Sequence, residues 1–353
     1  MPSIPRSPAQ YEKRSTHLRR IDILPALFLI VALFCLPAGS ESQALNALAI
    51  VFVSIVLEAI PIMLVGALIG GLIEAFVSRE RLTAMLPRKG WRTVCVAAAA
   101  GILFPVCECA VVPVVRRLMG KGLPFSAAIA YLLGGPIVNP VVAASTAMAY
   151  AFDWRVAALR LVLGYVIAVI IGLVMGRIVD ATRPNILGIM DTTMAQGCGG
   201  GCGCGCAHTM GPDDWLGKVG SAFCHAMDDF LAVGHYLVIG AFVAALAQTY
   251  IARSAFLTIT GAPFLAVGLM MAMAVLLNLC SEADAFIAAS LQGLVPLSAQ
   301  MAFMLTGPMF DLKLLLMYQE IFHRRVIAIL TILILSVVFG ACACIAWIEG
   351  LRL

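Results

Sequence analysis

A sixteen-residue phrase that occurs twice, 172 positions apart, is the feature that most constrains the fold of this chain. The first copy runs from Pro124 to Asn139 and the second from Pro296 to Asp311. Seven of the sixteen positions are identical without a gap, which is more than shared composition explains. We interpret the phrase as a duplication. A duplicated unit in an apolar chain is typical of a transporter with two pseudo-symmetric halves.

The composition places the chain in a lipid bilayer. Of its 353 residues, 62% are hydrophobic and only 12% are charged, with a mean hydropathy of +1.02. A soluble domain cannot bury that much apolar surface. The net charge of +4 is small, and no pattern of basic and aromatic residues indicates a nucleic-acid partner. The bilayer is therefore the predicted environment, and a homo-oligomer is compatible with it.

The predicted fold is an all-α polytopic membrane protein with about seven to nine crossings, since a span needs about 20 apolar residues. Two of the expected spans are Val94–Val115 and Phe256–Ala289. The predicted parts are a cytoplasmic tail at 1–20, a first span at 21–43, one repeat half at 44–179, a Gly/Cys-rich loop at 180–218 and a second repeat half at 219–353.

Each copy of the phrase is expected to form two short helices joined at a Gly-Pro break, because proline lacks the N–H and clashes with the preceding turn. These hinge positions are Gly135, Pro136, Gly307 and Pro308. If the hairpins are re-entrant, each half crosses three times and the halves are inverted. If each hairpin crosses once, the halves are parallel. The basic residues at 1–20 and 79–92 place the N-terminus in the cytoplasm and favour the inverted arrangement in the inner membrane.

The phrase Cys107-Glu108-Cys109 falls inside the expected span Val94–Val115. A carboxylate inside a membrane is costly and indicates a functional site. Thiolates suit Cu(I) and Zn(II), and trivalent arsenic is likewise thiophilic. The alternative is that each cysteine is only a small buried hydrophobic residue.

The second half carries a matching group, Cys280, Glu282 and Asp284, at nearly the same distance before its copy of the phrase. We predict that both halves bring thiols and acids to one site near the middle of the membrane. Asn139 and Asp311 follow the two Gly-Pro breaks, where their alternative role is to cap a helix. The predicted transport residues are Cys107, Glu108, Cys109, Cys280, Glu282, Asp284, Asn139, Asp311 and Glu58. Protonation of Glu108 or Glu282 is the predicted coupling step.

The loop Gly197–His208 contains four thiols and one imidazole separated mostly by glycine. Glycine permits almost any backbone angle, so the thiols can surround an ion. A disulfide would form there only in an oxidising space. The predicted metal ligands are Cys198, Cys202, Cys204, Cys206 and His208.

Several function classes leave no trace. The chain has no P-loop, no aspartyl-phosphate phrase, no GxSxG and no HExxH. The sequence therefore predicts a transporter without enzymatic activity and without a required cofactor, whose metal(loid) ion is cargo or ligand.

From about residue 45 onward, the chain resembles a predicted-permease family that includes bacterial organoarsenical exporters. The resemblance rests on Pro105–Cys109, Leu133–Pro140 and the second copy of that phrase at 305–311. The Gly/Cys loop resembles that of a subgroup considered to be copper or zinc efflux transporters and linked to arsenite resistance. The resemblance implies an efflux permease of the cytoplasmic membrane and leaves the ion open.

Three hypotheses remain at this point. The chain exports thiophilic metal(loid) ions; or it carries another small solute under control by metal at the Cys loop; or it is a membrane thiol-redox or metal-handling protein that transports nothing.

Overall fold

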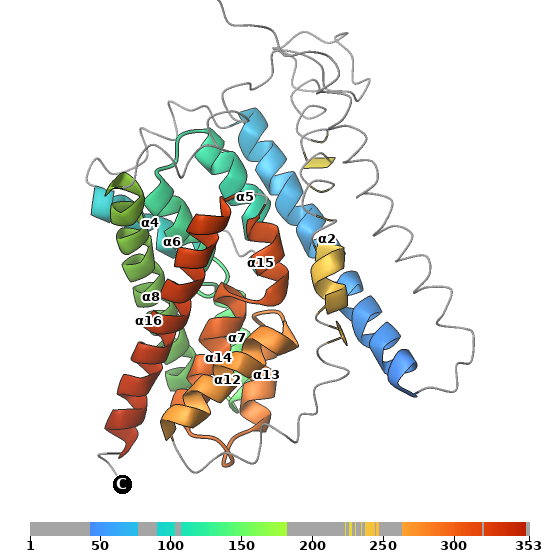
Figure 1. Cartoon of the computed structure of the whole chain (residues 1–353), viewed down its shortest axis with the longest axis vertical. Helices are drawn as coiled ribbons and strands as arrows, with labels where there is room; N and C mark the ends of the chain where they lie inside the picture. Colours follow the sequence, from blue (N-terminus) through green and yellow to red (C-terminus); the bar gives the residue numbers. More distant parts are fainter. Residues whose placement is uncertain are drawn as a thin grey trace, which may run out of the picture.

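The computed structural model describes residues 43–76, 90–102, 107–181, 263–319 and 321–350, with a few helical positions between 223 and 246. Every regular element in these ranges is a helix (Figure 1). The tail at 1–20, nearly all of the first span at 21–43 and the loop from 182 to 218 lie outside the described residues. Among the described residues, four segments are long and apolar enough to cross a membrane: Asn46–Ile69, Trp154–Val179, Leu297–Tyr318 and Arg324–Glu349.

The described helices fall into two parts, each of which ends in a long helix after several shorter ones. The first part comprises α2 (Gln43–Phe76), α4 (Gly90–Ala99) continued by the 3-10 turn η1 (Ala100–Ile102), α5 (Glu108–Gly120), α6 (Phe125–Gly134), α7 (Pro140–Ala149) and α8 (Trp154–Ala181). The second comprises α12 (Pro263–Leu277), α13 (Ala283–Ser290), α14 (Leu297–Met309), α15 (Leu312–Tyr318) and α16 (Arg324–Gly350).

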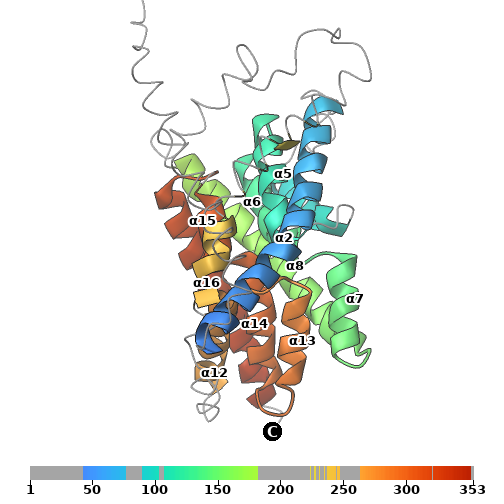
Figure 2. The same ribbon diagram turned by 90° about the vertical axis from the view of Figure 1, so that its right-hand side faces the viewer.

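The contacts within the two parts correspond. Helix α6 packs between α4 and α8, and α14 packs between α12 and α16. The contacts between the parts also occur in matching pairs: α15 touches α5, while α13 touches α7. Figure 1 shows α15 beside α5, and Figure 2 shows α7 beside α13. Each of these two contacts therefore joins one helix of the first part to one helix of the second.

Both of the long spans predicted around the acidic residues are broken, which corrects the expectation of continuous helices. In the first part, η1 ends at Ile102 and α5 begins only at Glu108. In the second part, α12 ends at Leu277 and α13 begins at Ala283. Asn278 has a φ of 52°, a left-handed conformation that asparagine adopts more readily than most residues and that cannot continue a helix. The acid-thiol groups thus stand at helix starts, not inside helices.

The Gly-Pro breaks differ between the two copies of the phrase. In the first, α6 ends at Gly134 and α7 begins at Pro140, as predicted. In the second, α14 continues through Gly307 and Pro308 to Met309, so the prediction that Pro308 breaks the helix is wrong. A proline in the last turn removes only one helical hydrogen bond, to the carbonyl four residues earlier, and the chain turns at Phe310 and Asp311 instead.

Close backbone approaches hold these breaks in place. A methyl group at Gly66 of α2 would overlap Ala110 of α5. A Cβ at Gly101 would lie 2.5 Å from the carbonyl oxygen of Gly135 and 2.7 Å from that of Val138, at the first break. Only glycine permits such approaches without displacing the neighbouring chain.

Candidate functional site

The start of α5 places a carboxyl group deep in the protein. Cys107 is extended and precedes the helix, and Glu108 is its first residue, with only 1% of its surface exposed. A carboxylate in the first turn is favoured by the partial positive charge of the helix N-terminus. That contribution is too small to offset the burial of a charge, so Glu108 needs a partner.

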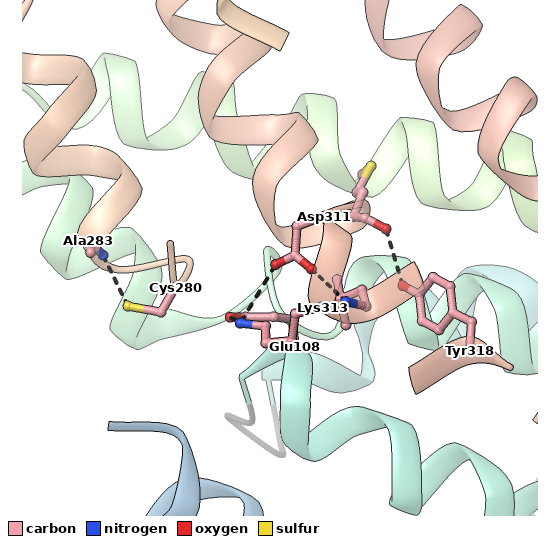
Figure 3. A network of polar contacts seen from close by, with 8 residues as sticks. Glu108, Cys280, Ala283, Asp311, Lys313 and Tyr318 are labelled. Atoms are coloured by element: carbon pink, nitrogen blue, oxygen red, sulfur yellow. Dashed lines mark hydrogen bonds and ion pairs between the residues drawn. The ribbon is translucent and has the colours of Figure 1, made fainter. Parts of the chain in front are cut away.

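The partner is Lys313, on the second residue of α15. Its ammonium lies 3.3 Å from a carboxylate oxygen of Glu108 and 3.6 Å from one of Asp311 (Figure 3). All three side chains are buried. Because a single cation lies between two carboxylates, the group has a formal charge of −1 when all three residues are ionised. It joins the two parts of the chain across the α5–α15 contact.

Backbone and amide donors complete this group. Asp311 precedes α15, and its Oδ1 accepts from the Leu314 backbone N–H at 2.6 Å. Asn278, at the end of α12, donates to the same oxygen at 2.9 Å when its amide nitrogen faces Asp311. We call Glu108, Asp311, Lys313 and Asn278 the Lys313 network. It contains two of the predicted site residues.

Two thiols border the Lys313 network. Cys107 and Cys109 are buried, are separated by one residue, and interact with each other electrostatically. Both thiols feel the charge of Lys313. Pro113 cannot donate to the carbonyl of Cys109, so this carbonyl also lacks its usual helical donor. The arrangement is a buried dithiol beside a cation and two carboxyls.

The second thiol-acid group lies in the turn between α12 and α13. The Cys280 thiol accepts from the Ala283 backbone N–H at 3.4 Å and also interacts with the Glu58 carboxyl of α2. The charges of Glu58 and Glu108 both act on Glu282. Glu58, Glu108, Cys280 and Glu282, which come from three separate segments, therefore interact electrostatically.

A second buried cation, Arg160, lies in the second turn of α8. One guanidinium nitrogen donates to the Thr146 hydroxyl of α7 at 2.8 Å. The other donates to the Ser281 carbonyl at 2.8 Å and to the Met304 carbonyl at 3.1 Å. Pro308 lacks the N–H that would bond the Met304 carbonyl in a regular helix, so arginine takes the place of that donor.

Asp284, in the first turn of α13, lies close to Arg160 and feels its charge. We call Arg160, Thr146, Ser281, Met304 and Asp284 the Arg160 cluster. It lies at the α7–α13 contact, the counterpart of the α5–α15 contact that holds the Lys313 network.

Asn139 has a local role in the structure. Its side chain accepts from the Val141 backbone N–H at 2.9 Å and caps α7. Within the described residues, no contact links it to the Lys313 network or the Arg160 cluster. This outcome matches the helix-cap alternative, whereas Asp311 both caps a helix and pairs with Lys313.

The described part of the chain contains no group of three or more His, Cys, Asp and Glu side chains placed to hold a metal ion. The predicted ligands Cys198, Cys202, Cys204, Cys206 and His208 lie outside it. Sequence reasoning missed Lys313 and Arg160. The rule that was applied to the acids would also have found these two cations, because a charged residue in a long apolar stretch indicates a functional or pairing role.

Comparisons with known proteins identify a family and several relatives of similar sequence. The profile of a family described as a predicted permease matches residues 44–346. The chain is 37% identical over 296 residues to UPF0718 protein YcgR of Bacillus subtilis, which covers 82% of this chain and 94% of that protein. It is 35% identical over 286 residues to a putative two-component membrane permease complex subunit of Streptococcus mutans, covering 81% and 90%. No solved structure matches.

Proposed function

The chain belongs to the predicted-permease family, a membership that makes it a multi-pass membrane permease, and we propose that it is a secondary exporter of thiophilic metal(loid) ions. The observation that carries the choice of cargo is the buried dithiol of Cys107 and Cys109 beside Lys313. Soft thiol ligands in a site enclosed by protein select soft ions over the hard cations that dominate in the cell.

Two thiols suit a cargo that takes two ligands. Cu(I) is one, and a trivalent arsenic species with one organic substituent is another. For the latter, two arsenic–oxygen bonds break and two arsenic–sulfur bonds form, and each thiol proton leaves in a molecule of water. Thiolates are the binding form, and a neighbouring ammonium stabilises them. Lys313 supplies that charge, while Glu108 and Asp311 hold it in place.

The matching contacts of the two parts support a transport mechanism. We propose that the parts are inverted repeats related by a pseudo-twofold axis, in which α5 corresponds to α13, α6 to α14, α7 to α15 and α8 to α16. Such an axis turns the α5–α15 contact into the α7–α13 contact and leaves the α6–α14 and α8–α16 contacts as they are. Broken helices at the junction of such repeats are the usual place for a cargo site. One part rocking against the other would open the Cys107–Cys109 dithiol to each side of the membrane in turn.

The remaining elements of the proposal concern delivery and assembly. The Gly/Cys loop, with Cys198, Cys202, Cys204, Cys206 and His208, would collect the ion in the cytoplasm and pass it to the dithiol. The protein would reside in the inner membrane with its N-terminus inside. The Streptococcus mutans relative is described as a subunit of a two-component complex. Expressing this chain alone tests whether it needs a second component or acts by itself.

Growth of a metal-sensitive bacterial host tests the proposed cargo. Cells expressing the chain should resist methylarsenite, arsenite, copper or zinc, and the ion to which resistance appears identifies the cargo. The double variant Cys107→Ala/Cys109→Ala should lose that resistance. The matched control is Cys342→Ala/Cys344→Ala, which removes two thiols at the same spacing from α16, one of them fully buried. Resistance retained without Cys107 and Cys109 would remove the dithiol from the mechanism.

A further inference from the structure

Asp284 is a buried carboxyl group without a hydrogen-bond donor. Its side chain is 1% exposed, and neither carboxyl oxygen accepts a hydrogen bond in the described part of the protein. Gly307 packs so closely over it that a methyl group there would overlap Oδ2. An ionised carboxylate in such surroundings is far more costly than a neutral carboxylic acid.

Arg160 is the cation that could pair with Asp284, yet its hydrogen bonds go elsewhere. Its terminal nitrogens donate to Thr146, Ser281 and Met304, all neutral acceptors, and its Nε has no partner. A guanidinium carries five donor hydrogens in a planar fork that suits a carboxylate. The fork is therefore engaged with carbonyls in this conformation and is close enough to Asp284 to act on its charge.

We propose that Asp284 is the proton-binding residue of this permease and that Arg160 is its alternative partner. The described conformation corresponds to Asp284 carrying a proton. A proton taken from one aqueous phase forms an O–H bond on the carboxyl. That bond breaks, and the proton leaves to the other phase, when Arg160 swings from its carbonyl acceptors to the carboxylate. The inference rests on the proposed transport function and names its coupling group.

The same movement reaches the cargo site through the backbone. In the described state Arg160 holds the Ser281 carbonyl in the turn that carries Cys280 and Glu282, and the Met304 carbonyl one turn before the Gly307–Pro308 pair. Releasing both carbonyls frees this turn and the end of α14. Proton release would thereby alter the junction where the two parts meet.

The charged surroundings single out Asp284 among the acids. Helices α14 and α7, which contact α13, contain no charged residue, and Tyr150 after α7 donates its hydroxyl to Gln300. Beyond Arg160 of α8, the charges acting on Asp284 come from Glu108 of α5 and from Asp311 and Lys313 of α15. Glu108, the carboxyl that the sequence analysis favours for coupling together with Glu282, already pairs with Lys313.

Infrared difference spectroscopy of the purified full-length protein between acidic and alkaline pH tests the assignment without any cargo. The wild-type protein should show the carbonyl-stretch band of a buried protonated carboxyl, and Asp284→Asn should lose it. Asp153→Asn, the same change at an exposed carboxyl that accepts from the Arg155 N–H, is the matched control and should keep it. A band that survives in Asp284→Asn, or that the wild type lacks, overturns the proposal.

The variant Arg160→Gln provides a second measurement, the pH midpoint at which the carboxyl band disappears. A purely structural role of Arg160 would leave that midpoint unchanged. Without its counter-charge, ionised Asp284 loses its partner, so the carboxyl band should persist to more alkaline pH than in the wild type. An unchanged midpoint would show that Arg160 is not the partner.

Asparagine resembles protonated aspartic acid in shape, so Asp284→Asn should fold, and a single size-exclusion peak verifies this.

Vesicle transport then separates this proposal from the proposed function. With methylarsenite as the probe, the ratio of pH-gradient-driven uptake to exchange at equal pH should collapse in Asp284→Asn and stay unchanged in Asp153→Asn. An unaltered ratio overturns the coupling role of Asp284. If wild-type vesicles move no methylarsenite in either assay, the proposed cargo fails, and the infrared result still decides whether Asp284 binds the proton.

Discussion

The Lys313 network and the Arg160 cluster occupy corresponding contacts between the two parts of the chain, yet they handle buried charge in opposite ways. In the first, the cation lies within 4 Å of two carboxylates. In the second, the hydrogen bonds of the cation to the described residues go to neutral oxygens, and none of those residues donates to the adjacent carboxyl. A network whose charges are already paired favours one arrangement. A cluster with one unmatched carboxyl can adopt two arrangements. This difference favours cargo binding at the Lys313 network and a change of conformation at the Arg160 cluster.

The largest expected difference between the two regions follows removal of each cation. Lys313→Met leaves Glu108 and Asp311 buried without a counter-charge, which should cost about 3–5 kcal/mol of unfolding free energy. Arg160→Met removes hydrogen bonds to neutral acceptors beside a carboxyl that can stay protonated, so the loss should be smaller. Denaturing-detergent titrations in mixed micelles measure both.

A double variant tests the charge pairing in the Lys313 network by the same titration. Adding Glu108→Gln to Lys313→Met should recover part of the lost stability, because one of the two unpaired charges is then gone. If the two single cation variants are equally destabilised, the contrast between a paired network and an unpaired cluster is wrong.

A smaller effect is expected from adding one methyl group beside Asp284. Gly307→Ala should lower the unfolding free energy by about 1–3 kcal/mol, since the new Cβ overlaps the carboxyl group. Gly340→Ala in α16 is the control: its Cβ meets nothing within 4 Å, and alanine favours a helix over glycine by up to about 1 kcal/mol. Thermal unfolding of the two variants should therefore shift in opposite directions, and a stabilised Gly307→Ala would show that the carboxyl is not confined.

The smallest effect concerns the two helix caps that occupy matching positions in the repeated phrase. Asn139→Ala should cost about 1 kcal/mol, the usual value of an N-cap, and Asn139→Ser should restore most of it. Transport should be retained by the serine variant. If a variant at Asn139 lost transport but kept its stability, Asn139 would belong to the cargo pathway, and its role would resemble that of Asp311.

Much of the architecture could be predicted from the order of residues alone. Apolar composition requires helices in a bilayer, because no water is present there to bond exposed backbone groups. The two repeat halves that the duplicated phrase predicts stay a prediction, although each described part ends in a long helix after several shorter ones. The acids and thiols were singled out because charged residues at membrane depth are rarely without a role, and their part in transport stays a prediction. Helix continuity was less well predicted, because whether a proline interrupts a helix depends on how near the helix end it falls.

The sequence by itself therefore determined that this chain is a helical membrane protein with thiols and carboxyls inside its apolar segments. Only the tertiary structure decided which charges meet. Glu108 pairs with a lysine 205 positions away, and Arg160 bonds carbonyls 121 and 144 positions away. Such partners are set by how helices cross and where their ends stop, and a linear spacing carries no record of either. The same packing left Asp284 without a donor, a feature that exists only in three dimensions.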